Sequence, residues 1–339
     1  MLVHASDRKP TEAESAIFFV RGNRDTSEYT DFIDQCRRQT FPVQIRSGLE
    51  VCYSPEHEME EKKQMKTEEI CDRIVRTLAA CPFIKGIVLG GSRATNTDEA
   101  DSDIDIGIYY EKEKLDYGML NRLAKELDDG RRDNLICQEG GWGPWVNCGG
   151  WLKIGGCSVD LILRDWRRVM DAVRETDAGK FSAHYQTGHP HAFLNVTYRG
   201  ELACCRILYS RDPDFKEQKQ YAETYPEALQ KALTGFFSFE AGFSCELAEK
   251  YLSRNDHCYL AGLAFRAVSA MNQALFALNR QWLLNEKKAI FRVDSFPKKP
   301  ADYSERVNKI FQVLGSEPMQ GITLMKTLCA RTQTFCEEL

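Results

Sequence analysis

Alternating carboxylates are the residues of this chain that most clearly indicate chemistry. Asp101, Asp103 and Asp105 are spaced two apart at the start of an apolar run, Ile104 to Tyr110. In an extended segment such residues point to one face, where their like charges repel. Carboxylates placed so closely share a proton or bind a divalent cation that cancels the repulsion. The spacing therefore predicts an acidic site at the beginning of a strand.

A glycine-rich turn precedes the carboxylates and supplies complementary groups. Gly90 and Gly91 allow a ligand to approach the backbone closely, and Ser92 offers a hydroxyl and a helix-start amide to a phosphate. A phosphate site beside a cation-binding carboxylate site matches the requirements of a nucleoside triphosphate with Mg²⁺.

These motifs resemble the signature of the DNA polymerase beta-like nucleotidyltransferase superfamily, including its minimal and antibiotic-modifying members. The resemblance covers roughly Met65 to Asp165. It rests on four residues at a fixed spacing, with ten residues between the two pairs: Gly91 and Ser92, then Asp103 and Asp105. The two pairs together are a far more specific signal than a Gly-Ser pair alone.

The resemblance implies a third acidic residue on a later strand. Asp160 is its match, because it stands inside the apolar run Val159 to Leu163. The family chemistry would make Asp103, Asp105 and Asp160 both catalytic residues and metal ligands. Two Mg²⁺ ions would then stabilise the attacking and leaving oxygens of an in-line displacement. The alternative, surface carboxylates that cap turns, explains Asp101 but does not explain a charge within the apolar run.

The same resemblance implies that Gly90, Gly91, Ser92 and Arg93 bind the nucleotide, with ATP as the expected triphosphate. The expected activity is nucleotidyl transfer of EC 2.7.7 type to a hydroxyl of a small, antibiotic-like acceptor, with release of pyrophosphate. Two alternatives are nucleotidylation of a protein or RNA, as in toxin-antitoxin relatives, and a non-catalytic nucleotide-binding protein. The RNase partner module of such systems has an Arg closely followed by a His, and no such His follows Arg266. The full set of carboxylates argues against the non-catalytic alternative.

Composition limits the choice of partners. A formal net charge of −5 and a pI near 5.8 argue against extensive, sequence-independent binding of nucleic acid. The 13 cysteines include no C-x-x-C pair, which predicts reduced thiols in a cytoplasmic protein. Met1 to Pro10 has no apolar core of signal length, and no apolar run is long enough to cross a bilayer. We therefore expect no membrane partner.

Three regions follow from these patterns, and the fold class expected from them is α+β. Residues 1–64 fall outside the family pattern and form an N-terminal extension of unclear role. The resemblance implies that residues 65–180 form the nucleotidyltransferase domain, a mixed sheet flanked by helices. Residues 181–339 form a mainly helical, substrate-side domain.

Hydrophobic spacing predicts the elements of these regions. The expected helices and strands are a helix from Thr67, a strand from Phe83 to Leu89, a strand from Ile104 to Tyr110, a helix from Lys114 to Asp128, a helix capped by Asp165, and two long helices, Glu227 to Leu252 and His257 to Leu284.

The segment Gly140 to Gly156 is rich in glycine and tryptophan. Its spacing predicts two strands, about Trp145 to Ile154 and Cys157 to Leu163, joined by a hairpin at Gly155-Gly156. The tryptophans then either stack against a base or a ring-shaped acceptor, or pack at an edge and in the core. Both interpretations remain open at this point.

Two further groups of polar residues have a functional and a structural interpretation. The nearby histidines His184, His189 and His191 invite a metal site, but their spacing favours ordinary histidines in a loop. Asn272, Asn279 and Glu286 recur every seven residues. They would either bind an acceptor or, as the pattern favours, make ordinary contacts between helices.

Overall fold

The computed structural model describes residues 44–46, 50–52, 65–94 and 102–339. The chain divides into two compact units, residues 1–62 and 63–339. The described part of the first unit is an antiparallel pair, β1 (Gln44–Arg46) and β2 (Glu50–Cys52). Asp101 lies outside the described residues, and the domain boundary predicted at residue 180 stays a prediction.

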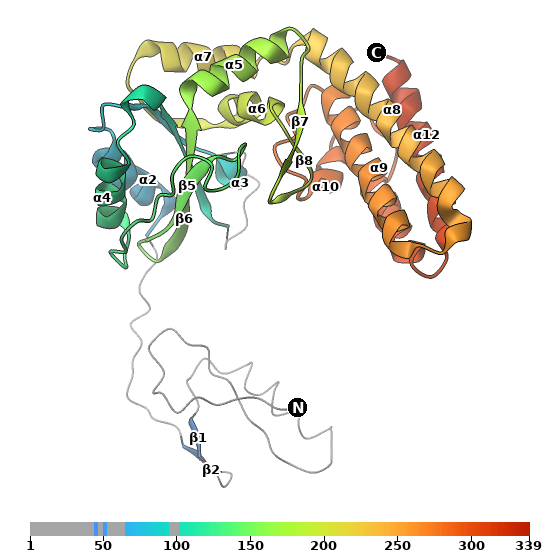
Figure 1. The fold of residues 1–339 in the computed structure, drawn as a ribbon, viewed down its shortest axis with the longest axis horizontal. Helices are drawn as coiled ribbons and strands as arrows, with labels where there is room; N and C mark the ends of the chain where they lie inside the picture. Colours follow the sequence, from blue (N-terminus) through green and yellow to red (C-terminus); the bar gives the residue numbers. More distant parts are fainter. Residues whose placement is uncertain (1–43, 47–49, 53–64, 95–101) are drawn as a thin grey trace. The chain divides into compact units, whose positions relative to one another are not determined.

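The second unit contains a mixed sheet of five strands. In spatial order they are β5 (Cys148–Ile154), β6 (Cys157–Asp165), β4 (Ile104–Tyr110), β3 (Ile84–Leu89) and β9 (Arg206–Ser210). β4 and β6 are parallel, whereas the other neighbouring strands are antiparallel. Figure 1 shows helices around this sheet and a group of long helices after it. The arrangement confirms the predicted α+β fold class.

One face of the sheet is apolar because alternate strand residues point to it. Ile106 and Leu161 lie in a core with residues of two helices, α2 (Thr67–Leu78) and α4 (Tyr117–Leu127). In α2 the buried residues Ile70, Ile74 and Leu78 recur at helical spacing, as the sequence predicts. α4 begins later than predicted because the Asp116 carboxylate caps it by accepting from the Met119 amide at 2.9 Å. A short helix, η1 (Lys112–Lys114), precedes this cap.

Helices pack on the opposite face at the end of β4 where Tyr109 stands. Tyr109 of β4 makes edge contacts with Trp166 and Phe215. These two rings come from α5 (Trp166–Asp177) and α7 (Pro213–Glu223). Both Tyr109 and Phe215 belong to a second core that continues into the helical region. The start of β4, where the carboxylates stand, lies at the other end of this strand.

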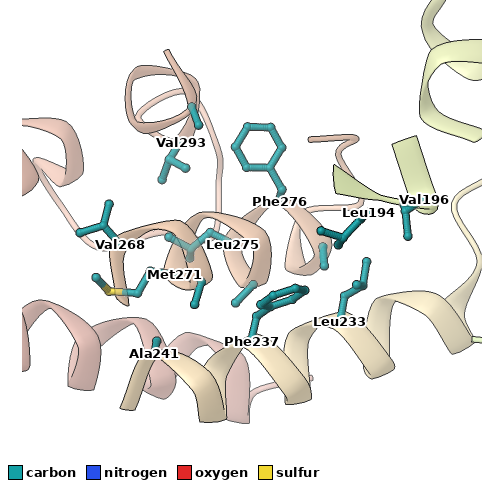
Figure 2. Packing of buried hydrophobic residues seen from close by; sticks show 14 of the residues in the cluster. Leu194, Val196, Leu233, Phe237, Ala241, Val268, Met271, Leu275, Phe276 and Val293 are labelled. Atoms are coloured by element: carbon teal, nitrogen blue, oxygen red, sulfur yellow. The ribbon is translucent and has the colours of Figure 1, made fainter. Parts of the chain in front are cut away.

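The rest of the second unit is mainly helical. Its elements are α6 (Val196–Cys204), α8 (Glu227–Tyr251), η2 (Leu252–Arg254), α9 (His257–Leu278), α10 (Ala289–Val293), α11 (Tyr303–Leu314) and α12 (Pro318–Glu337). Figure 2 shows Phe237 and Ala241 of α8 packing in one buried cluster with Met271 and Leu275 of α9. No helix in the described part of the chain is long and apolar enough to cross a membrane.

Two predictions of secondary structure in this region were wrong. α9 ends at Leu278 and not at Leu284, because Asn279 caps it and Arg280 takes a left-handed φ of 53°. The side-chain amide of Asn279 donates, through Nδ2, to the carbonyl oxygens of Leu275 at 2.7 Å and of Lys298 at 2.8 Å. The histidine-containing segment is a hairpin and not a loop: β7 (Ala183–Gln186) pairs with β8 (His189–Leu194).

Candidate active site

Three side chains form a row across the sheet. Asp105 of β4 is paired in register with Asp160 of the parallel strand β6. Asp160 is in turn paired with Trp151 of the antiparallel strand β5. Directly paired residues share a face of a sheet, so all three side chains lie on one face. Their sequence neighbours Ile104, Ile106, Val159 and Leu161 are buried, which places the row on the face opposite the apolar core.

The third carboxylate, Asp103, stands just before β4 and is exposed. Burial raises the pKa of Asp105 to about 6, and the charges of Asp160 and then Asp103 add to this effect. Burial also raises the pKa of Asp160, with Asp103 as the next cause. The predicted acidic residues Asp103, Asp105 and Asp160 are therefore close enough in space to repel one another.

The glycine turn lies directly against this row. Gly90 donates its backbone amide to the Asp105 carbonyl oxygen at 2.8 Å. Gly91 begins a short helix, α3 (Gly91–Ala94), with a left-handed φ of 59°. A Cβ atom on Gly91 would lie 1.8 Å from Oδ2 of Asp105, so a side chain there would occupy the position of the carboxylate. The turn therefore needs glycine at this position both for its backbone conformation and for the space.

Arg93 joins the turn to the segment that carries Asp103. Its Nε and Nη2 donate to the Ser102 carbonyl oxygen at 3.2 and 2.5 Å. Its Nη1 donates to the Thr67 hydroxyl at 3.2 Å, which connects α3 to α2. The guanidinium thus fixes the backbone ahead of β4. The predicted contact of Arg93 with a phosphate stays a prediction, as do those of Gly90, Gly91 and Ser92.

The carboxylates fit a divalent cation by their chemistry. Among the described residues, no group of three or more His, Cys, Asp or Glu side chains is gathered tightly enough to chelate one ion. Carboxylate oxygens are nevertheless the ligands that Mg²⁺ prefers, and Asp103, Asp105 and Asp160 supply them from two adjacent strands. The repulsion that contributes to the raised pKa of Asp105 is what a cation between these groups would relieve.

Two charged residues near this row, Lys287 and Glu201, were not predicted from the sequence. The positive charge of Lys287 opposes the effect of burial on the pKa of both Asp105 and Asp160. Lys287 follows α9 in a turn where its amide donates to the Asn285 side chain at 2.8 Å. In sequence it belongs to the ordinary charged run Glu286-Lys287-Lys288, so only the fold brings it to the carboxylates.

Glu201 of α6 adds negative charge that raises the pKa of Asp105 further. Its carboxylate accepts two hydrogen bonds from the guanidinium of Arg164, at 2.6 and 2.7 Å. Arg164 stands on β6 two strand alternations beyond Asp160, and its side chain is only 4% exposed. The pair anchors α6 to the strand that carries Asp160.

Two histidines of the β7–β8 hairpin, His189 and His191, pair with carboxylates of the helical region. His189 Nδ1 lies 3.4 Å from Glu286, and His191 Nε2 lies 3.9 Å from Glu240. Glu286 also accepts from the His191 amide at 3.1 Å. Each of these two histidines therefore lies near a different glutamate, and the contacts connect the hairpin to α8 and to the segment after α9.

Two members of the Asn272, Asn279 and Glu286 stripe make structural contacts within the helical region. Asn272 is buried and accepts from the Tyr303 hydroxyl at 2.9 Å. Asn279 caps α9. Glu286 lies beyond the end of α9, at the hairpin contact described above.

The tryptophans of the glycine-rich segment have different environments. Trp145 packs against the second core and stacks on His184 at 3.6 Å between ring centroids. Trp151 is 62% exposed, and its ring stacks on Trp142 at 4.8 Å with an interplanar angle of 25°. The hairpin turns at Gly155 and Gly156, as predicted, with positive φ values of 58° and 81°. The structure thus places Trp145, partly buried, against the second core and Trp151 on the face of the carboxylate row.

Comparison with known proteins gives one family match within this region. The family described as Polymerase beta, Nucleotidyltransferase matches residues 72–136. No match was found among curated proteins. Among solved structures, a nucleotidyltransferase-like protein from Exiguobacterium sibiricum 255-15 is similar at 12% identity and a TM-score of 0.39, over 80% of this chain and 75% of that chain. The family match contains Gly91, Asp103 and Asp105 but ends before Asp160, which the sheet places opposite Asp105.

Proposed function

Because residues 72–136 match the nucleotidyltransferase family described above, we propose the reaction that the chain carries out. It transfers a nucleoside monophosphate from a triphosphate, with ATP as the first choice, to a hydroxyl of a small, antibiotic-like acceptor. The observation that supports this proposal most strongly is the pairing of Asp105 with Asp160 on parallel strands, beside Asp103 and the Gly91 turn.

The roles of the residues follow from their places in the row. Asp103 and Asp105 bind Mg²⁺, with Asp160 as a further ligand, while the backbone of the Gly90–Ser92 turn faces the outer phosphates. When bound, Mg²⁺ supplies positive charge to the phosphate oxygens and to the leaving pyrophosphate. Lys287 adds positive charge from the helical side.

Asp160 is the group best placed to act on the acceptor. Asp160 stands on β6, on the side of Asp105 away from the glycine turn, and there it accepts the proton of the attacking hydroxyl. The hydroxyl oxygen then forms a bond to the α-phosphorus. The bond between the α-phosphorus and the oxygen bridging to the β-phosphate breaks, and pyrophosphate leaves.

The acceptor class rests on charge and composition. A net charge of −5 is unfavourable for a long nucleic-acid acceptor. The helical region after the sheet can supply side chains that select a small acceptor. The free cysteines fit an enzyme of the cytoplasm. Protein and RNA acceptors are the alternative outcome of the test below.

The test is release of pyrophosphate with Mg²⁺ and each of the four NTPs, against a panel of aminoglycosides, lincosamides and simple polyols. We expect release that requires an acceptor and is lost in Asp103→Asn and Asp160→Asn. Asp133→Asn is the matched control, because Asp133 is an exposed carboxylate paired with Lys125 of α4, on the other side of the sheet. Equal release by wild type and Asp103→Asn would refute the proposal. NTP binding without turnover would redirect it to protein or RNA acceptors.

A further inference from the structure

The carboxylate row has the glycine turn at its β3 end and Trp151 at its β5 end. α3 follows β3 and lies against Asp105 of β4, so the glycine turn is on the β3 side of the row. Asp160 comes next, on β6, and Trp151 stands beyond it on the edge strand β5. Adjacent strands are about 4.8 Å apart. Trp151 is therefore a neighbour of Asp160 and two strands away from Asp105.

Trp151 has a surface exposure that packing does not explain. Its side chain is 62% exposed, although burying an indole in the core would be favourable. A neighbouring ring nevertheless holds the Trp151 side chain in place, because its indole stacks on Trp142. Trp142 lies over Gly149, where a Cβ would be 2.3 Å from the indole ring. The two indoles thus form an ordered aromatic surface on the same face of the sheet as Asp160, the residue paired with Trp151, and aromatic side chains commonly line ligand sites.

Backbone contacts hold the platform in place. The Trp142 amide donates to the Asn147 carbonyl oxygen at 2.9 Å. The Gln186 amide group donates to the Trp142 carbonyl oxygen at 2.7 Å, and its oxygen accepts from the Trp145 amide at 3.1 Å. Gln186 is buried at the end of β7, so the platform is connected to the hairpin that contacts the helical region. Such prior ordering lowers the entropic cost of binding a ligand.

We propose that Trp151, supported by Trp142, is the acceptor subsite, and that the acceptor presents a sugar or aromatic ring to its indole face. The inference rests on the proposed function and specifies its substrate class. A ring stacked on Trp151 carries its hydroxyl towards Asp160, the neighbouring residue that accepts the proton. The triphosphate occupies the other side of the row, against the glycine turn, and does not touch Trp151.

The test compares acceptor kinetics in Trp151→Ala, Trp151→Phe and wild type. Ring-bearing acceptors of the panel are measured beside glycerol, an acyclic polyol, and the affinity for Mg²⁺ with a non-hydrolysable ATP analogue is measured separately by calorimetry. Phe311→Ala removes another partly exposed aromatic residue, on α11, and serves as the matched control. Circular dichroism and melting of each variant report folding.

We expect Trp151→Ala to raise the KM for ring acceptors about tenfold or more, because an aromatic stack is lost. Trp151→Phe should recover most of that loss, and nucleotide affinity and any use of glycerol should not change. An unchanged acceptor KM would overturn the inference and leave the proposed function intact. A loss of nucleotide affinity would instead make Trp151 a nucleobase platform. Absence of transfer to every acceptor by the wild type would refute the proposed function, and this inference with it.

Discussion

A Cβ atom built on Gly91 would lie 1.8 Å from Oδ2 of Asp105, although the two residues belong to different elements. Gly91→Ala must therefore displace the carboxylate, and it also forces alanine into a left-handed conformation. We expect transfer activity to fall about a hundredfold, because a shift of about 1 Å in a positioned group has an effect of that size. Steady-state kinetics at saturating NTP measures the loss.

Gly90→Ala is the matched control for this change. A Cβ there would lie 3.7 Å from the Asp105 carbonyl oxygen, an ordinary van der Waals distance. We expect this variant to keep most of its activity. If both alanine variants were equally inactive, the loss would come from the turn as a whole and not from the contact with Asp105.

The raised pKa of Asp105 predicts a pH-dependent stability of the metal-free protein. Burial and the charge of Asp160 raise this pKa from 3.8 to about 6, so the folded state binds the proton more tightly than the unfolded state. The stability contribution of this group is present below about pH 4 and is lost as the pH rises through 6. Asp105→Asn should therefore be more stable than wild type at pH 8, by roughly 1–3 kcal/mol, and should match it near pH 4.

Urea unfolding in the presence of a chelator, at pH 4 and pH 8, measures this difference. Asp133→Asn provides the control, because its carboxylate is 71% exposed. The explanation would be wrong if Asp105→Asn were equally or less stable than wild type at pH 8.

The ion pair between Arg164 and Glu201 predicts a large effect on stability. Glu201→Ala leaves the guanidinium of Arg164 buried without its counter-charge. Removal of one partner of a buried pair typically costs about 3–5 kcal/mol in the free energy of unfolding. Asp171→Ala, which breaks the exposed pair with Arg174, should cost less than about 1 kcal/mol. Urea unfolding measures the free energy of unfolding of both variants. Similar losses in the two would mean that water solvates the Arg164 guanidinium once Glu201 is removed.

The buried amide of Gln186 predicts a local effect on the tryptophan segment. Gln186→Leu leaves the Trp142 carbonyl and the Trp145 and Val146 amides without this partner. We expect a loss of about 1–3 kcal/mol in stability and faster hydrogen exchange at residues 142–146. Gln186→Glu keeps the acceptor but loses the donor, so its exchange should be intermediate. Unchanged exchange in Gln186→Leu would show that other contacts alone fix the segment.

Local patterns were sufficient to predict much of the sheet and its acidic residues. The strand from Ile104 to Tyr110 and the hairpin at Gly155-Gly156 agree with prediction, because strand alternation and glycine turns depend on neighbouring residues. The end of α9 was missed, since its cap uses the Lys298 carbonyl, which is distant in sequence. The histidine hairpin was missed because its contacts come from Glu240 and Glu286 of other elements.

The sequence by itself predicted which carboxylates gather at the candidate site, because the alternation of Asp103 and Asp105 and the apolar run around Asp160 are local properties of strands and the family resemblance implies a third acidic residue. Only the tertiary structure decided what surrounds them. Strand order places Asp160 between Asp105 and Trp151, and the turn after α9 brings Lys287 to the same carboxylates. These relationships depend on register and on packing between distant segments, which no local spacing specifies.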